Sequence, residues 1–133
     1  MKNKKHKHNQ LKSQPDSPDG HQDAYEVRGR LWINGKDGTF LGYGRVVLLE
    51  RIREHGSITM AAKSMEMSYR AAWELVESMN TQAKTPLVET VTGGKGGGGA
   101  RLTEAGERAI ETFWNLYESF KKFLKNETQH LEF

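Results

Sequence analysis

Hydrophobic and polar positions follow two different periods along this chain, and the changes between them divide it into short elements. Residues 25–34 are rich in β-branched and aromatic side chains and predict a β-strand. Residues 35–38, which read Gly-Lys-Asp-Gly, are typical of a turn, and residues 39–41 predict the returning strand. Over residues 45–55 the apolar side chains recur with helical spacing, and Gly56 suits the end of that helix.

Two further helices follow in quick succession. Ser57 is a candidate N-cap for a short helix over residues 58–65, and Ser68 is a candidate N-cap for a second helix over residues 69–82. The side chains expected to point inward are Ile58, Ala61, Ala62 and Met65 in the first helix, and Ala72, Leu75, Val76 and Met79 in the second. Two short helices joined by a tight turn, with Met67 as an apolar plug between them, form the helix-turn-helix pattern.

The remaining pattern predicts a β-hairpin and a long helix. Residues 87–91 alternate as a strand does, residues 93–99 read Gly-Gly-Lys-Gly-Gly-Gly-Gly, and residues 101–102 can form the returning strand. Thr103 is a candidate N-cap for a helix over residues 104–125. The predicted fold class is therefore mainly α with a small β component. It is a winged helix-turn-helix with an N-terminal β-hairpin, a glycine-rich wing and a long C-terminal dimerisation helix.

Composition divides the chain into one domain and a polar tail. The chain has 133 residues and no cysteine, which excludes disulfides, thiolate zinc sites and cysteine nucleophiles. Residues 1–24 contain one large aliphatic side chain and predict a disordered basic tail. Residues 25–126 are expected to form the winged helix-turn-helix domain, followed by a short C-terminal tail over residues 127–133. We interpret the histidines of the first tail as solvated, so no metal site and no cofactor are expected.

The charge and hydropathy of the chain limit its partners. The formal net charge is +3, and most of it falls in the basic tail, so binding to nucleic acid would depend on where individual charges lie. No stretch is long and apolar enough to span a membrane. The basic N-terminus lacks the apolar segment of a secretory signal, so we expect a cytoplasmic protein with no membrane partner.

The helix-turn-helix pattern assigns candidate DNA contacts to the starts of its two helices. Such a unit places the N-terminal end of its second helix in the major groove. Arg70 can pair with guanine or with a phosphate, and Ser68 can bond a phosphate oxygen. Trp73 either contacts a base or sugar or packs against the wing. The candidate contacts are Ser57, Thr59, Ser68, Tyr69, Arg70 and Trp73.

The glycine run admits three interpretations, of which a nucleotide-binding loop is the first. It lacks the Gly-Lys-Ser/Thr order of a phosphate-binding P-loop. It contains the spacing of a dinucleotide fingerprint, but no second parallel strand follows, so no bound nucleotide is expected. A loop without a partner is the second interpretation. The third is a wing tip whose glycines let the backbone approach DNA closely, with Lys95, Gly96, Gly97 and Arg101 as contacts.

Two blocks carry a resemblance to a known family. They are residues 56–73, which include Met-Ser-Tyr-Arg-Ala-Ala-Trp, and residues 92–103, which read Thr-Gly-Gly-Lys-Gly-Gly-Gly-Gly-Ala-Arg-Leu-Thr. With them, residues 26–125 resemble the N-terminal DNA-binding domain of the ModE-type molybdate-dependent transcriptional regulators, which is related to the LysR type. The resemblance implies a homodimer that binds operator DNA, with its recognition helix over residues 68–82 and its wing over residues 91–102.

This sequence departs from the family pattern in two respects. Regulators of this family carry C-terminal domains that bind the molybdate oxyanion. No such domain is expected within residues 1–133, so no molybdate site is expected in this chain. The turn position that often holds glycine in helix-turn-helix units is Glu66. Either the turn tolerates this residue, or its geometry differs slightly.

The long helix has the pattern of a dimer interface. A seam of apolar residues recurs at spacings of three and four, as in a coiled coil, and consists of Ala109, Phe113, Leu116, Phe120 and Phe123. One flank of the helix is expected to pack on its own domain and the other on a second copy, with packing entirely within one chain as the alternative.

The sequence therefore predicts a homodimeric transcription regulator that binds double-stranded DNA in a sequence-specific manner. The alternative is a winged-helix module that binds proteins instead of DNA. No enzyme is expected, because no arrangement of nucleophile, base and orienting group is evident. The operator, the target genes, the direction of regulation and any effector do not follow from the sequence.

Overall fold

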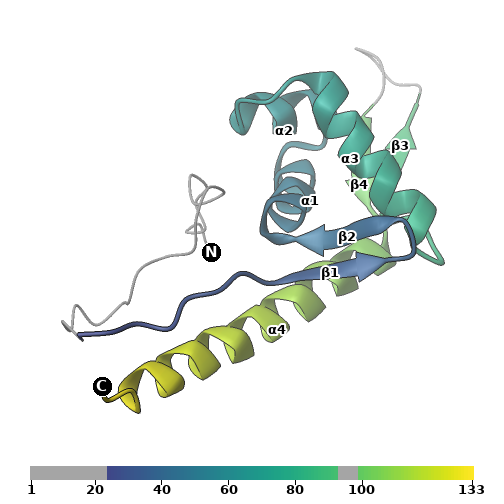
Figure 1. Cartoon of the computed structure of the whole chain (residues 1–133). Helices are drawn as coiled ribbons and strands as arrows, with labels where there is room; N and C mark the ends of the chain where they lie inside the picture. Colours follow the sequence, from purple (N-terminus) through teal and green to yellow (C-terminus); the bar gives the residue numbers. More distant parts are fainter. Residues whose placement is uncertain (1–23, 93–98) are drawn as a thin grey trace.

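The computed structural model describes residues 24–92 and 99–133 of the chain (Figure 1). Its elements in chain order are β1 (Trp32–Gly35), β2 (Gly38–Gly42), α1 (Tyr43–His55), α2 (Ile58–Ser64), α3 (Tyr69–Gln82), β3 (Val88–Val91), β4 (Gly99–Leu102) and α4 (Glu104–Gln129). Strands β1 and β2 form one antiparallel hairpin, and β3 and β4 form a second.

Helix α1 forms the centre of the hydrophobic core. Elements α2, α4, β2 and β4 all pack on it, so it is buried on several sides and shows no single apolar stripe. Its buried side chains are Val46, Val47, Leu48, Leu49 and Ile52. The other helices add Ala61 and Ala62 of α2, Met79 of α3, and Ile110 and Phe113 of α4 to the same core.

The turn between α2 and α3 is a Schellman motif. The Glu66 N–H donates to the carbonyl of Lys63 at 3.1 Å, and the Met67 N–H donates to the carbonyl of Ala62 at 3.0 Å. Glu66 has φ 57°, in the left-handed region that favours glycine. The turn therefore keeps the expected geometry and holds a glutamate in it, which is the first of the two alternatives that the sequence left open.

The second hairpin packs against the helix-turn-helix through its backbone. The Ala100 N–H of β4 donates to the carbonyl of Gly56, between α1 and α2, at 3.0 Å. A Cβ atom on Gly99 would lie 2.7 Å from the same carbonyl oxygen, so this close approach requires glycine. At the other end of the hairpin, the Thr103 N–H donates to the carbonyl of Leu87 at 3.0 Å, where α4 begins. A helix-turn-helix followed by such a hairpin is a winged helix-turn-helix, and the predicted fold class is confirmed.

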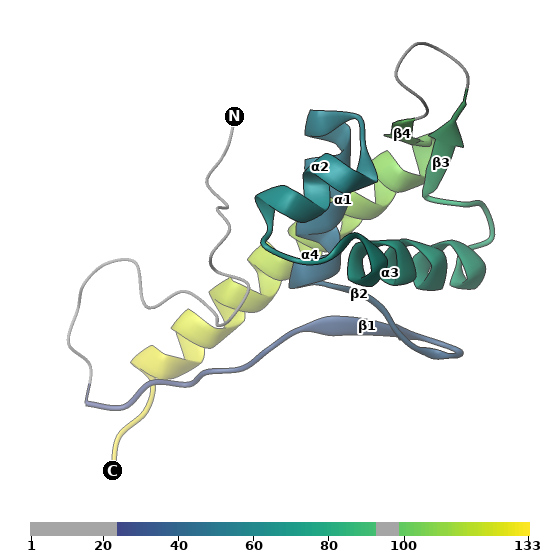
Figure 2. The same ribbon diagram turned by 90° about the horizontal axis from the view of Figure 1, so that it is seen from above.

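The C-terminal half of α4 extends beyond the core and is accompanied by the segment before β1. Figures 1 and 2 both show residues 24–31 running beside this half of the helix. The Val27 N–H donates to Thr128 Oγ1 at 2.9 Å. Gly29 lies close to Phe120, and the Tyr25 and Phe133 rings meet edge to face with centroids 5.2 Å apart. The two ends of the described chain therefore pack together.

Two predicted elements differ from the structure. The strand predicted over residues 25–34 is wrong for residues 25–31, which are extended but pair with no strand, because their neighbour is α4 and not a sheet. The last helix continues to Gln129, past the predicted end at Lys125, so residues 127–129 are helical and not part of a tail. In its last turns Thr128 is buried and accepts a hydrogen bond from the Val27 N–H.

Candidate nucleic-acid interface

The N-terminal end of α3 is accessible to a large ligand. Ser68 caps the helix by accepting a hydrogen bond from the Ala71 N–H at 3.0 Å. The next turn exposes 53% of Tyr69 and 43% of Trp73, and the Arg70 side chain is 85% exposed. This end of the helix also carries unpaired backbone N–H groups and the positive end of the helix dipole. The predicted recognition residues are therefore at the surface, as DNA contact requires.

Charge and apolar surface alternate on this turn of α3. Arg70 Nε lies 3.5 Å from Glu74 Oε2, an i,i+4 ion pair whose carboxylate side is 61% exposed. Exposed pairs of this kind are weak, so a better acceptor can displace Glu74 from the guanidinium. Tyr69, Arg70, Trp73 and Glu74 together line a shallow pocket of about 230 Å³. Trp73 thus lines an open pocket on the outer surface of α3.

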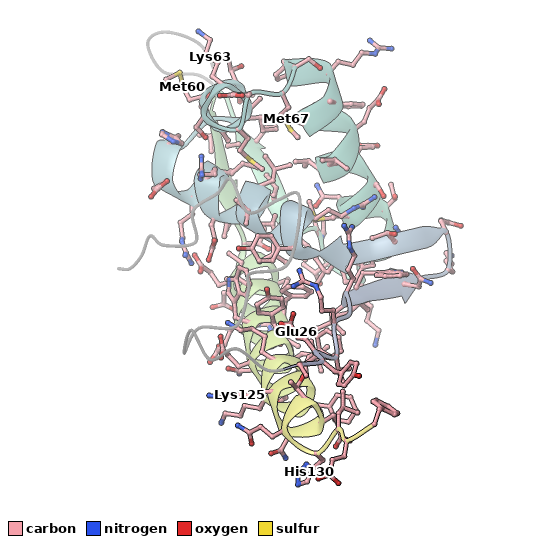
Figure 3. All side chains as sticks on the ribbon, turned by 60° about the vertical axis from the view of Figure 1, so that its left-hand side comes forward. Glu26, Met60, Lys63, Met67, Lys125 and His130 are labelled. Carbon is pink, nitrogen blue, oxygen red and sulfur yellow. The ribbon has the colours of Figure 1, made fainter. Side chains whose placement is uncertain are left out.

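Helix α2 lies beside this end of α3 and adds further surface. Ser57 caps it by accepting a hydrogen bond from the Met60 N–H at 3.0 Å, and Thr59 is exposed. Figure 3 shows Met60 and Lys63 on the outer side of α2, whereas Met67 lies between the two helices as predicted. Met60 and Lys63 were not among the predicted contacts, although their exposure follows from helical spacing around the buried Ala61 and Ala62.

The β3–β4 wing lies at the same end of the molecule as α2 and the start of α3 (Figure 1). On it, Arg101 of β4 faces Glu89 of β3, and Arg101 Nε donates to Glu89 Oε2 at 2.8 Å. The Arg101 side chain is 69% exposed, but this pair offsets part of its charge. Lys95, Gly96 and Gly97, the other predicted wing contacts, lie outside the described residues.

Asn80 joins the recognition helix to the base of the wing. Its Oδ1 accepts from the Leu87 N–H at 2.8 Å and from the Val88 N–H at 3.2 Å, and its Nδ2 donates to the Val88 carbonyl at 2.9 Å. One side chain thus satisfies three backbone groups at the start of β3. Sequence reasoning missed Asn80, because a single polar residue near the end of a helix carries no periodic signal.

Gln82 has a similar role at the other hairpin. Its Nε2 donates to the Thr39 carbonyl at 2.9 Å, and its Oε1 accepts from the Asp37 N–H at 3.3 Å. A Cβ atom on Gly35 would collide with this amide, so the turn between β1 and β2 is fitted to it. The C-terminal part of α3 is therefore attached to both hairpins, whereas its N-terminal part is exposed.

The predicted dimer seam on α4 is divided between two environments. Phe113 is fully buried in the protomer core, because it lies on the side of α4 that faces α1, so it has no surface to offer a partner. Phe120 is partly covered by the segment around Gly29. Leu116 is 42% exposed and Phe123 is 56% exposed, and Ala109 is partly exposed.

Other kinds of site find little support among residues 24–92 and 99–133. Within these ranges no group of three or more His, Asp or Glu side chains is placed to hold a metal ion. None of the helices described is long and apolar enough to cross a membrane.

Comparison with known proteins adds relatives of this domain. Residues 44–107 match the model of the bacterial regulatory helix-turn-helix proteins of the lysR family. The chain is 38% identical over 108 residues to the molybdenum transport protein ModE of Azotobacter vinelandii, covering 81% of this chain and 40% of that protein. It is 49% identical over 69 residues to the transcriptional regulator ModE of Yersinia pestis, covering 52% and 26%.

Two further matches complete the comparison. The chain is 41% identical over 91 residues to the molybdenum-pterin-binding protein MopB of Rhodobacter capsulatus, covering 68% of this chain and 34% of that protein. A crystal structure of a LysR family transcriptional regulator aligns with a TM-score of 0.47 at 20% identity, covering 61% of this chain and 26% of that one. The chain therefore spans between 26% and 40% of the length of these three sequence relatives.

Proposed function

We propose that this chain is a transcription regulator that binds double-stranded DNA in a sequence-specific manner, because residues 44–107 match the helix-turn-helix model of the bacterial regulatory lysR family. The resemblance to ModE-type regulators is confirmed at 38% and 49% identity to two proteins of that name. One of these relatives is described as a transcriptional regulator, and it matches the chain over 69 residues.

The exposed N-terminal turn of α3 is the observation that carries this proposal. An α-helix fits the major groove, and arginine reads guanine there through the O6 and N7 acceptors. The Arg70 side chain is 85% exposed on this turn, and its ion pair with the Glu74 carboxylate is itself exposed and therefore weak. In the proposed complex Arg70 exchanges Glu74 for guanine, and the backbone N–H groups at Ser68 face a phosphate.

The wing supplies the second part of the proposed interface. Lys95 and Arg101, with Gly96 and Gly97 allowing close approach, contact the DNA backbone or minor groove in this proposal. Ser57 and Thr59 at the start of α2 contact the phosphates on the other flank. Asn80 supports the arrangement, because it connects the recognition helix directly to the first wing strand.

A homodimer completes the proposal. Leu116 and Phe123 leave apolar surface on α4, and pairing this face with a second copy would cover it. A two-fold dimer would present two recognition helices to half-sites one helical turn apart, roughly 34–36 Å along the duplex. We propose that the protein acts in the cytoplasm, where it would meet chromosomal DNA.

A protein-binding module is the second candidate, and one observation favours it. Tyr69 and Trp73 place two exposed aromatic rings on the same turn of α3, and exposed aromatic residues are enriched in protein interfaces. Binding to DNA in a sequence-dependent manner would separate the two candidates.

Selection of bound sequences from random double-stranded DNA tests the proposal. We expect a palindromic consensus with guanine in each half-site. Gel-shift titrations then compare Arg70→Ala with the native chain on the selected sequence and on random DNA. Loss of one bidentate contact should weaken specific binding by about 10-fold or more and change random binding much less.

Arg108→Ala is the matched control. Arg108 also lies in an i,i+4 pair with a glutamate, 3.8 Å from Glu104, but on α4, which begins at the base of the wing. It should leave both affinities unchanged. Equal losses on both DNAs for Arg70→Ala, or selection that yields no consensus, would contradict the proposed function.

A further inference from the structure

The pocket at the start of α3 combines aromatic and charged surface. The rings of Tyr69 and Trp73 lie one helical turn apart and both are about half exposed. Arg70 and Glu74 form an ion pair at 3.5 Å on the same turn, and all four side chains line the same pocket. An occupant of this pocket would therefore meet two aromatic rings and a cation at once.

The chemistry of the lining selects against a phosphate as the occupant. The rings offer little to an anion, and the Glu74 carboxylate, 3.5 Å from Arg70, would repel one. On the floor of the major groove, the apolar feature of a base pair is the C5-methyl group of thymine. The pocket is open to solvent, so a methyl group can reach its aromatic lining without movement of the backbone.

Arg70 determines which base lies beside the thymine that carries this methyl group. Its guanidinium is the cation of this lining, and its preferred partner in the groove is guanine. A thymine methyl between the rings and a guanine at Arg70 must belong to neighbouring base pairs, because the side chains that contact them are adjacent on one helical turn.

This inference rests on the proposed function and extends it to the bases that are read. We propose that the pocket formed by Tyr69, Arg70, Trp73 and Glu74 receives the C5-methyl group of a thymine that adjoins the guanine bound by Arg70. Trp73 is then a specificity-determining residue.

Replacement of thymine by uracil tests this proposal, since it removes the methyl group and leaves every hydrogen-bonding group in place. On the selected operator, each thymine is replaced in turn and the affinity of the native chain is measured by gel shift. We expect one position in each half-site, beside the guanine, at which uracil weakens binding about three- to five-fold, the value of one buried methyl group. Thymines outside the half-sites should show no effect.

Variants of the pocket identify which side chain detects the methyl group. Trp73→Ala should bind the thymine and uracil operators equally, and Trp73→Phe should retain part of the difference because it keeps a ring. Tyr69→Phe should keep the full difference, since only a hydroxyl group is removed. Trp73 is partly exposed, so these changes spare the core.

Three results would overturn the inference while leaving sequence-specific DNA binding intact. The selected half-site contains no thymine beside its guanine, or no single uracil weakens binding, or Trp73→Ala responds to uracil as strongly as the native chain does. The absence of any consensus would instead remove the proposed function itself.

Discussion

Glu66 shows how a single residue accommodates the geometry of the helix-turn-helix turn. Its φ of 57° places a side chain in a region that ordinarily costs about 1 kcal/mol or more for residues other than glycine. The cost is offset by the two hydrogen bonds of the Schellman motif, from Glu66 to Lys63 and from Met67 to Ala62. The left-handed conformation of Glu66 is therefore a consequence of the Schellman motif, since glutamate itself disfavours it.

Glu66→Gly should accordingly stabilise the protein. We expect the free energy of unfolding to rise by about 0.5–1 kcal/mol, since relief of strain exceeds the added entropy of the unfolded chain. Urea denaturation followed by circular dichroism measures it. The same exchange at Glu77, in the middle of α3, should lower stability by about 1 kcal/mol. A loss of stability at both positions would show that Glu66 is not strained.

Tyr117 provides a pH-dependent prediction. Burial, together with the nearby Tyr43 and Glu118, raises the pKa of the Tyr117 phenol. Below about pH 10 the phenol is neutral in both folded and unfolded chains, so its contribution to stability is fully present. Above that value the unfolded chain ionises first, and the contribution is lost as the pH rises.

Tyr117→Phe should therefore reduce the loss of stability between pH 9 and pH 11 by about 1.4 kcal/mol. The comparison is of the change with pH within each protein, which removes any constant effect of the lost hydroxyl group. Parallel curves for the native chain and Tyr117→Phe would contradict the prediction.

At the scale of elements, the helices were the most predictable part. Helix α3 was predicted with its full bounds, because its inward stripe repeats clearly and Ser68 marks its start. The extended residues 25–31 were not, since β-branched and aromatic side chains also suit a segment that lies along a helix. The contacts that join elements, those of Asn80 and Gln82, depend on tertiary placement and leave no pattern along the chain.

At this scale, a prediction concerns the contact of Asn80 with the first wing strand. Asn80→Ala leaves the N–H groups of Leu87 and Val88 without their side-chain acceptor, and should cost about 1–3 kcal/mol of stability. It should also weaken binding to selected and random DNA alike, because the wing is no longer held to α3. Faster hydrogen exchange confined to the amides of β3 would mark the role in positioning.

Thr81→Ala is the control for this variant. The neighbouring Thr81 hydroxyl bonds only to carbonyls of its own helix among the contacts described, those of Glu77 and Ser78. It should change neither DNA affinity nor exchange in β3. If the Asn80→Ala variant has a lower free energy of unfolding but the DNA affinity of the native chain, the role of Asn80 is limited to stability.

At the scale of the whole molecule, the apolar seam of α4 lies partly in the core and partly at the surface. Phe113 completes the core, whereas Leu116 and Phe123 remain at the surface. The three- and four-residue spacing could not distinguish the buried residue from the exposed ones. Residues that repeat in this way span an arc of the helix that is wide enough to face both the core and a partner. The glycine run carried the family resemblance, and its predicted contacts with DNA stay predictions.

Phe123→Glu tests whether this surface forms the dimer. We expect the native chain to sediment as a dimer and the variant to shift toward monomer by at least 10-fold in dissociation constant, since a buried carboxylate replaces an apolar contact. Affinity for the full operator should fall toward that for a half-site. Lys122→Glu, on the neighbouring exposed position, should remain dimeric. A native chain that is already monomeric at micromolar concentration would contradict the proposed dimer.

The pairing of Val27 with Thr128 joins residues 101 positions apart in the chain. On the ribosome, residues 24–31 emerge early and have no place to dock until the last turns of α4 have been synthesised. The helix-turn-helix and wing contain their own contacts and can fold before then. Docking of this segment is thus timed by the synthesis of the last turns of α4, which carry the acceptor of the Val27 N–H.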